Sequence, residues 1–256
     1  MSDRAIQDAL IRALADAPYR QSAEWLERKL ANPERVDLFA RFLARHFYFE
    51  RIVHFFKYSR ALGRVTGRAP ESVLSGEGFQ GLLSGIVLGG RDSAVAVAKL
   101  VVAYVKTGDI TPIPYLRDLL EYEEAMMVVE SGARVWRETP THDSRRTTRD
   151  VVERTEGTVL LDLDYDLPLV LPQLLRQWET VPQAPRVQTQ LLIARSRHGR
   201  VSVARTSAPI EKIIELADGR RSLDDLARQA GLRPAELAAT VQGLVEIGAV
   251  RFSTGS

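Results

Sequence analysis

The stretch DGRRSLDDLARQAGLRPAELAATVQGLVEIGAVRF, residues 218–252, carries the clearest structural pattern of this chain. Ser222 precedes a short segment with apolar residues at helical spacing, and two aspartates follow it in the first turn. A serine in this position accepts a hydrogen bond from a free backbone N–H group, and acidic residues favour the same end of the helix dipole. Gly231 is typical of a helix C-terminus, and Pro234 of the first turn of the next helix. The pattern therefore predicts two consecutive helices joined by a tight turn.

One more helix and a final strand frame this pair. Apolar residues recur at helical spacing over 210–216, which predicts a helix that ends at Gly219. AVRF, residues 249–252, predicts a short strand at the end. The apolar face of the last helix consists of Leu237, Val241, Leu244 and Val245. Three helices followed by a strand are typical of a winged helix.

The preceding segment has strand-like patterns. Residues 159–166 alternate apolar and acidic side chains, and residues 187–195 and 200–205 flank a glycine-containing turn as in a hairpin. The intervening LPLVLPQLL predicts a short helix that is broken at Pro172. We therefore expect a small winged-helix-like C-terminal domain over residues 158–256 with a three-stranded antiparallel sheet.

The first half of the chain is predicted to be all helical, with a domain over residues 1–137. Its most unusual part is VDLFARFLARHFYFERIVHFFKYSRALG at 36–63, whose aromatic residues lie on most sides of a helix. Such a helix is buried against several neighbours or against a partner protein. Residues 138–157 are polar and aperiodic, which predicts a linker. The expected fold class is therefore α+β, an all-helical N-terminal domain plus the small C-terminal domain.

Composition excludes several functional classes. The 256 residues include no cysteine, which excludes disulfides and thiolate chemistry. The net charge of +2 gives only a weak indication of an anionic partner. No stretch approaches the roughly 18 apolar residues of a spanning helix, and the N-terminus lacks the apolar run of a signal peptide. We therefore expect a cytoplasmic protein without a membrane partner.

A winged helix raises the hypothesis of a DNA-binding transcription regulator. In that class the last helix enters the major groove and needs basic residues for phosphate and polar ones for bases. Between residues 209 and 248 the sequence has five basic and seven acidic residues, and Glu236 and Glu246 are the ionisable residues between Pro234 and Gly248. This charge balance disfavours DNA, although the arginine-rich hairpin keeps the hypothesis open.

Peptide capture is the other use of this architecture. An edge strand offers unpaired backbone groups to an extended peptide, and a neighbouring helix supplies one wall of a groove. The candidate edge is 200–205 and the candidate wall is the last helix, and the arginines favour an acidic peptide. The predicted peptide-binding residues are Arg200, Val201, Val203, Arg205, Leu237, Val241 and Gln242.

Two parts of the chain resemble known families. SAPIEKIIELADGRRSLDDLARQAG at 207–231, with VQGLVEIGAVRF at 241–252, resembles the PqqD-type precursor-recognition domains of peptide-modifying pathways. Three segments are similar to the partner subunits of multinuclear non-haem iron oxidative enzymes, namely HFYFERIVHFFKYSRALGRVTGRAPESVLSGEGFQGLL at 46–83, PYLRDLLEYE at 114–123 and YDLP at 165–168. These helical proteins accompany the iron enzymes of methanobactin and thiaglutamate biosynthesis, and the resemblance spans about residues 35–252.

The resemblance implies a non-catalytic subunit that binds a ribosomally made precursor peptide and docks it to a separate iron enzyme as a heterodimer. Iron is then a cofactor of the partner enzyme, with none in this chain. Aromatic and arginine residues are enriched at interface centres. The predicted partner-binding residues are Phe47, Tyr48, Arg51, Phe55, Tyr58, Asp164 and Tyr165.

Candidate catalytic and metal-binding groups are few. His46, Glu50 and His54 are spaced four apart on one predicted helix, but no second helix offers matching histidines, so we interpret them as interfacial or structural. Two acidic clusters, Glu121–Glu124 and Asp162–Asp166, come with no plausible nucleophile or base. The sequence therefore predicts that the chain is not an enzyme by itself and holds no metal.

Overall fold

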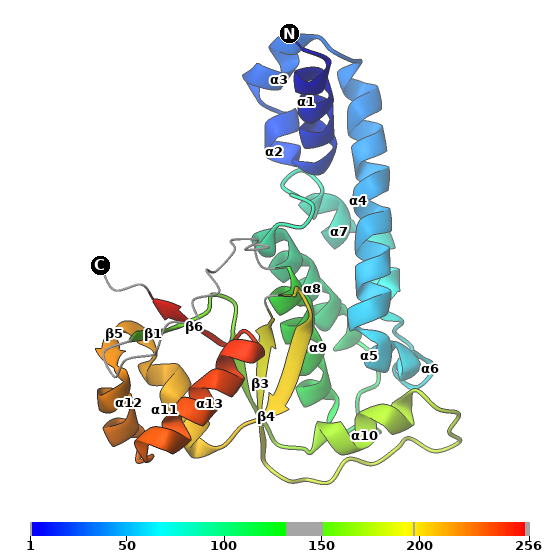
Figure 1. The fold of residues 1–256 in the computed structure, drawn as a ribbon. Helices are drawn as coiled ribbons and strands as arrows, with labels where there is room; N and C mark the ends of the chain where they lie inside the picture. Colours follow the sequence, from blue (N-terminus) through cyan, green and yellow to red (C-terminus); the bar gives the residue numbers. More distant parts are fainter. Residues whose placement is uncertain (1, 132–150, 197, 254–256) are drawn as a thin grey trace. The chain divides into compact units, whose positions relative to one another are not determined.

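The computed structural model describes residues 2–131, 151–196 and 198–253 (Figure 1). The chain forms two compact units. The first comprises residues 1–131 and 167–184, and the second comprises residues 132–166 and 185–256. The chain is a mixture of helix and sheet, as the α+β prediction requires.

The first unit begins with three short helices that pack beside one long helix (Figure 1). Their N-termini are capped by the side chains of Ser2, Asp16, Ser22 and Asn32, each of which accepts a backbone N–H. The long helix presents the small residues Ala40 and Ala44 to the interior. These helices are α1 (Asp3–Ala15), α2 (Ala17–Arg20), α3 (Ala23–Arg28) and α4 (Pro33–Phe55).

The rest of the first unit centres on two buried helices, α8 (Arg91–Val105) and α9 (Leu116–Glu130), which pack on each other. Both lie within the part of the chain, residues 1–137, that was predicted to be all helical. Around them lie α5 (Lys57–Ala61), α6 (Gly63–Thr66), the 3-10 helix η1 (Pro70–Ser75), α7 (Glu77–Leu82) and α10 (Leu167–Leu174).

Helix α10 corrects the sequence prediction in two respects. It continues through Pro172 to Leu174, although proline removes one backbone hydrogen bond of the helix. Burial of one apolar face, which includes Val170, Leu171 and Leu174, outweighs that loss. The helix also belongs to the first unit, whereas the sequence assigned it to a C-terminal domain over 158–256.

The second unit contains two three-stranded antiparallel sheets, where the sequence predicted one. The predicted sheet has the order β2-β3-β4 and consists of β2 (Val159–Leu163), β3 (Thr189–Arg195) and β4 (Val201–Arg205). The other sheet has the order β5-β1-β6 and consists of β1 (Val151–Arg154), β5 (Asp218–Ser222) and β6 (Val250–Ser253). The end of the predicted linker 138–157 is therefore a central strand, and residues 138–150 lie outside the described part of the chain.

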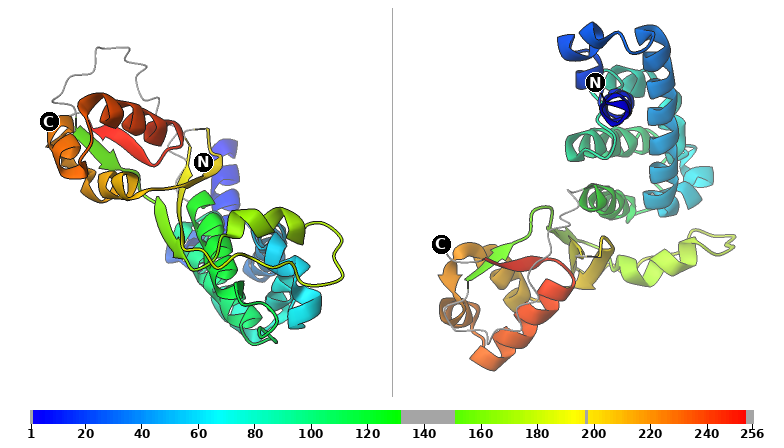
Figure 2. Two further views of the ribbon diagram at one scale, coloured as in Figure 1. Left: turned by 90° about the horizontal axis from the view of Figure 1, so that it is seen from below. Right: turned by 45° about the horizontal axis from the view of Figure 1, so that its top comes forward.

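The described part of the second unit also contains α11 (Ala208–Leu216), α12 (Leu223–Ala230) and α13 (Pro234–Glu246). Figure 2 shows α13 beside β6. The predicted signals at α12 are confirmed. The Ser222 hydroxyl accepts the N–H of Asp225, and Gly231 ends the helix at φ +69°. The three helices pack against one face of β3 and form one buried apolar cluster with it. Leu192 and Ala194 are the β3 residues of this cluster.

Candidate functional site

Strand β4 is one edge of its sheet, because the order β2-β3-β4 gives it a single neighbour. Two backbone hydrogen bonds bracket its pairing with β3: Ser196 N donates to Arg200 O over 2.8 Å, and Thr206 N donates to Gln190 O over 3.1 Å. In an antiparallel ladder such bonded pairs alternate with unbonded ones. The backbone groups of Val201, Val203 and Arg205 therefore point away from β3. We call these outward N–H and C=O groups the β4 edge.

The side chains of the same residues lie on a definite face of the sheet. Val203 is paired with Ile193, and Ala204 with Leu192. Paired residues share a face, so Val201, Val203 and Arg205 lie on the face opposite to the one that packs on the helices. Val203 is 38% exposed there.

This placement corrects the predicted groove. Leu237 and Val241 lie inside the helical core, at 2% and 1% exposure, together with Leu192 from the other face of the sheet. They therefore do not form one surface with Val201 and Val203. The period-two alternation of a strand separates the two groups. The backbone of β4 is available for pairing, whereas the predicted apolar lining is not assembled.

The charged residues of the hairpin are partly engaged. Arg205 Nη2 donates to both carboxylate oxygens of Asp166, over 2.6 and 2.8 Å, and Asp166 is almost completely buried. Arg200 and His198 are exposed near the turn, whereas Arg197 lies outside the described residues. The pair of Arg205 with Asp166 fixes the end of β4, and Arg200 adds positive charge beside its start.

Helix α13 meets the same hairpin at its C-terminal end. A Cβ atom at Gly248 would overlap the carbonyl oxygen of Arg195, and Gly248 has φ +82°. Only glycine fits such a close approach at positive φ. On the helix itself, Gln242 donates to Glu246 over 3.1 Å, and its buried Oε1 has no donor among the described atoms. Of the predicted residues on α13, Gln242 alone retains an unused hydrogen-bonding atom.

The predicted partner-binding residues of α4 and α5 are buried or half-buried. Tyr48 is completely buried and Phe55 nearly so, so neither can contact a partner. Arg51 is held by Glu130 and by the Ser131 hydroxyl at 2.6 Å, and Phe47 and Tyr58 are half-buried. Burial also raises the pKa of Tyr48 to about 12. In the second unit, Asp164 is exposed and Tyr165 half-buried, which leaves their predicted role open.

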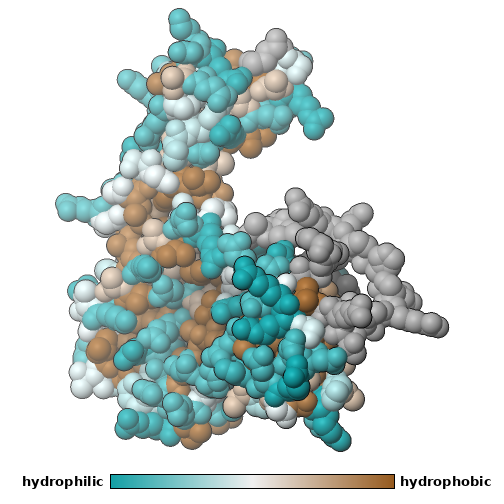
Figure 3. All heavy atoms as spheres, turned by 90° about the vertical axis from the view of Figure 1, so that its left-hand side faces the viewer, coloured by the Kyte–Doolittle hydropathy of each residue, from teal (hydrophilic) through white to brown (hydrophobic). Residues whose placement is uncertain are grey.

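The exposed apolar residues of α4 are different ones, namely Leu38, Phe39, Phe42 and Phe49. The sequence did not distinguish them because aromatic residues occupy nearly every side of the helix. The signal that distinguishes the faces is the pair Ala40 and Ala44, whose small side chains mark the interior. Apolar residues also reach the surface elsewhere, as the brown areas among teal on the face drawn in Figure 3 show.

Glu123 is the most perturbed ionisable group of the described chain, and the sequence did not single it out from its neighbours. It is completely buried in α9 and accepts the N–H groups of Tyr58, over 2.8 Å, and Ser59, over 3.2 Å. Desolvation raises its pKa to about 8, against the opposing effect of these bonds. The spacing of Leu116, Leu119 and Glu123 is the signal that places it on the buried face. Its contacts assign it a structural role at the start of α5.

The metal candidates of α4 are engaged with aromatic rings. His46 stacks on Phe42 with ring centroids 6.5 Å apart, and His54 meets Phe55 edge-on at 4.7 Å. Within the described residues no three or more histidine and carboxylate side chains converge as metal ligands would. The same described part of the chain has no helix with the length and hydropathy needed to cross a membrane.

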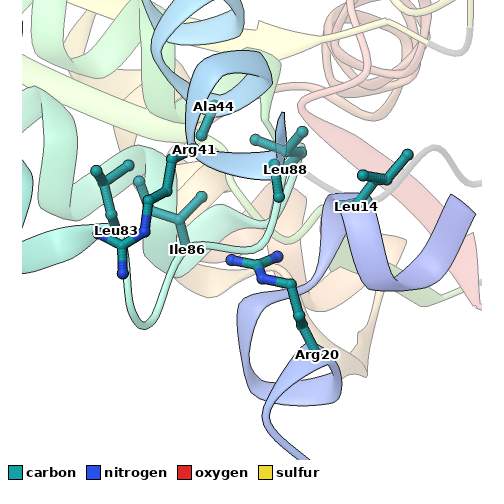
Figure 4. A pocket seen from close by; sticks show the side chains of 9 residues that line it. Leu14, Arg20, Arg41, Ala44, Leu83, Ile86 and Leu88 are labelled. Carbon is teal, nitrogen blue, oxygen red and sulfur yellow. The ribbon is translucent and has the colours of Figure 1, made fainter. Parts of the chain in front are cut away.

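A small cavity lies between α1, α4 and the segment before α8 (Figure 4). Its volume of about 10 Å³ is far below the 300–1,000 Å³ of ordinary ligand pockets. Both arginines at its wall bind Asp37, Arg20 over 3.0 Å and Arg41 over 2.6 Å. The cavity is therefore a packing feature, stabilised by an ion-pair network, and we do not assign a ligand to it.

In comparisons with known proteins, neither a family model nor a curated protein matches this sequence.

Proposed function

We propose that this chain is a non-catalytic subunit that captures a ribosomally made precursor peptide by strand addition to β4. The observation that carries the proposal is the β4 edge. It presents the N–H and C=O groups of Val201, Val203 and Arg205 in one row, and no backbone hydrogen bond to another described residue occupies them. An added strand would form main-chain bonds with these groups without any change in the sheet.

The side chains around the edge indicate what kind of peptide it accepts. On the face opposite to the helices, the exposed Val203 suits an apolar side chain of the added strand. Arg200 favours an acidic residue near the hairpin turn, whereas Arg205 is already paired with Asp166. We therefore expect an extended peptide with apolar residues in alternation and a carboxylate at one end.

The composition of α13 favours this function over DNA binding. Its exposed residues include Ala235, Ala238, Ala239 and Gly243, whose side chains cannot form a hydrogen bond to a base edge. Its exposed carboxylates Glu236 and Glu246 repel phosphate. The last helix therefore lacks what a major-groove helix needs.

The chemistry of the pathway is assigned to a partner. The resemblance of residues 46–83, 114–123 and 165–168 to partner subunits of multinuclear iron enzymes supports a division of labour. In our proposal the partner enzyme holds the iron and modifies the peptide. This chain binds the peptide and docks that enzyme in a heterodimer.

The substitution Val203→Pro tests strand addition directly. Proline removes the outward N–H of residue 203 but no bond to β3, a position where edge strands tolerate proline. One lost main-chain bond, worth about 1 kcal/mol, and the bulk of the ring should weaken the binding of a labelled precursor leader at least about tenfold in fluorescence anisotropy.

The matched control is Val203→Thr, which keeps the N–H and should bind within about twofold of wild type. Circular dichroism verifies that both variants are folded. Equal affinity of the proline variant and wild type would contradict strand addition at β4. Binding of duplex DNA with a steep salt dependence would favour the transcription-regulator hypothesis instead.

A further inference from the structure

Helix α4 exposes an unusual amount of apolar surface on one face. Leu38 is 72% exposed, Phe39 51%, Phe42 64% and Phe49 40%. At about 100° per residue, all four lie within roughly 60° of the direction of Phe42. Phe39 and Phe42 stack with their ring centroids 6.3 Å apart, so the exposed rings support one another.

The polar residues on the same face are all basic or neutral. Arg35, Arg45 and His46 lie in the same angular range and are exposed. Neither Arg35 nor Arg45 forms a salt bridge with another described residue. The nearest carboxylates of the helix, Glu34 and Glu50, lie roughly 80° away at its margins. We call these four apolar and three basic residues the α4 stripe.

The size of the stripe is that of an interface core. From the exposed fractions, its three phenylalanines and one leucine present roughly 400 Å² of apolar surface. A contiguous apolar patch of this size on a soluble protein is often functional. It supplies about half of the roughly 800 Å² that each partner contributes to a stable interface, and the polar rim can supply the rest.

We propose that the α4 stripe docks an apolar groove, edged by carboxylates, on a different protein. The charge of the stripe selects this occupant, because its arginines need acidic partners that the stripe does not contain. A second copy of this chain would place the same cations opposite each other, since a two-fold interface uses the same patch twice. Aromatic and arginine side chains mixed in one patch are also typical of protein interface centres.

The arrangement also disfavours a membrane surface. A helix that lies in a bilayer interface has separate apolar and basic faces. Here Arg45 and His46 lie along the stripe between Phe42 and Phe49, so immersion of the rings would bury their polar groups. This inference rests on the proposed function in one respect, since it takes the iron-dependent partner enzyme as the docked protein.

The experiment uses the full chain co-expressed with the enzymes encoded in neighbouring reading frames. The complex is isolated by size-exclusion chromatography with light scattering, and its affinity is measured by calorimetry at low and high salt. The double variant Phe39→Ser/Phe42→Ser should weaken the complex at least about 30-fold. Arg45→Glu should weaken it about tenfold and reduce the salt dependence. These residues are exposed, so the variants should fold normally.

The matched control is Leu169→Ser/Leu175→Ser, which removes similarly exposed apolar residues from α10 and the turn that follows it and should leave the affinity unchanged. The proposal is overturned if the α4 variants bind the enzyme with unchanged affinity, or if the chain forms no complex with any neighbouring enzyme. It is also overturned if the isolated chain forms a dimer that the α4 variants abolish, or if it binds phosphatidylserine vesicles through the stripe. If the enzyme complex forms without the stripe while the leader still needs β4, the proposed function survives and only the docking surface is wrong. If the enzyme complex needs the stripe but the leader binds β4 variants as well as wild type, the proposed peptide site is wrong and the docking surface is supported.

Discussion

The buried carboxylate of Glu123 predicts a specific dependence of stability on pH. Its pKa of about 8 in the folded chain lies above the ordinary value of 4.5. Between these values the folded chain binds more protons than the unfolded chain, so the free energy of unfolding falls as the pH rises. This contribution is fully present below pH 4.5 and is lost as the pH approaches 8.

The size of the effect follows from the same two values. Each pH unit inside the window corresponds to about 1.4 kcal/mol, so the step from pH 5 to pH 7 removes about 2–3 kcal/mol. Glu123→Gln removes the titration and keeps an amide oxygen that can accept the N–H groups of Tyr58 and Ser59. We expect the wild type to lose 2–3 kcal/mol more than this variant between pH 5 and pH 7, roughly the step worked above.

Urea unfolding followed by circular dichroism at pH 5, 6 and 7 measures this difference. Glu50→Gln is the matched control, because Glu50 is exposed on α4, and it should retain the wild-type slope. Equal losses for wild type and Glu123→Gln would refute the reasoning, since they would show that the carboxylate ionises as easily in the folded chain as in the unfolded one.

Three further substitutions test the second unit by thermal or urea unfolding. Gly248→Ala forces a Cβ into a neighbouring backbone at positive φ and should destabilise the chain by about 3 kcal/mol or more. Gly243→Ala is the control, because Gly243 has open space around it in α13, and it should stabilise the chain by about 0.5–1 kcal/mol. Equal effects of the two substitutions would contradict the close approach at Gly248. Arg205→Ala leaves the buried carboxylate of Asp166 without its cation and should cost about 1–2 kcal/mol, a value reduced by the exposure of the arginine. An unchanged unfolding midpoint of Arg205→Ala would show that solvent replaces the arginine without loss of stability.

The elements that could be predicted from the sequence are those determined by residues that are close together in the chain. The start of α12 follows from the Ser222 hydroxyl, and its end from Gly231, because a cap is formed by residues within one turn of the helix. The β3–β4 hairpin has the same local character, with Gly199 at φ +78° in its turn. Such features need no knowledge of distant residues.

The second sheet could not be predicted for the opposite reason. Strand β1 has four residues, and its partners β5 and β6 lie more than 60 residues further along the chain. Neither Asp218–Ser222 nor Val151–Arg154 has a clear alternation of apolar residues. In β1 only Val152 is fully buried. The pairing itself makes these segments strands, and no local pattern encodes it.

The prediction that Leu237 and Val241 line a groove beside β4 was wrong for a related reason. Sequence spacing identified β4 as a strand and Leu237 and Val241 as one helix face, but it did not say which face of the strand meets the helix. The register decides this, because Leu192 pairs with Ala204 and lies in the helical core. A shift of one residue would have brought Val203 to that core.

The unequal faces of α4 connect the fold to the docking proposal. Helix α1 buries Ala9 and Ala13, and α4, which packs against it, buries Ala40 and Ala44. Small residues on both sides allow helix axes to approach closely. The large side chains Leu38, Phe39 and Phe42 then lie outside that contact, where exposure to water costs about 25 cal/mol for each Å² that a neighbour could cover. A sequence selected only for the stability of this unit would place these rings inside and alanines outside. The inverted order on α4 is explained when the outer face is buried by another protein.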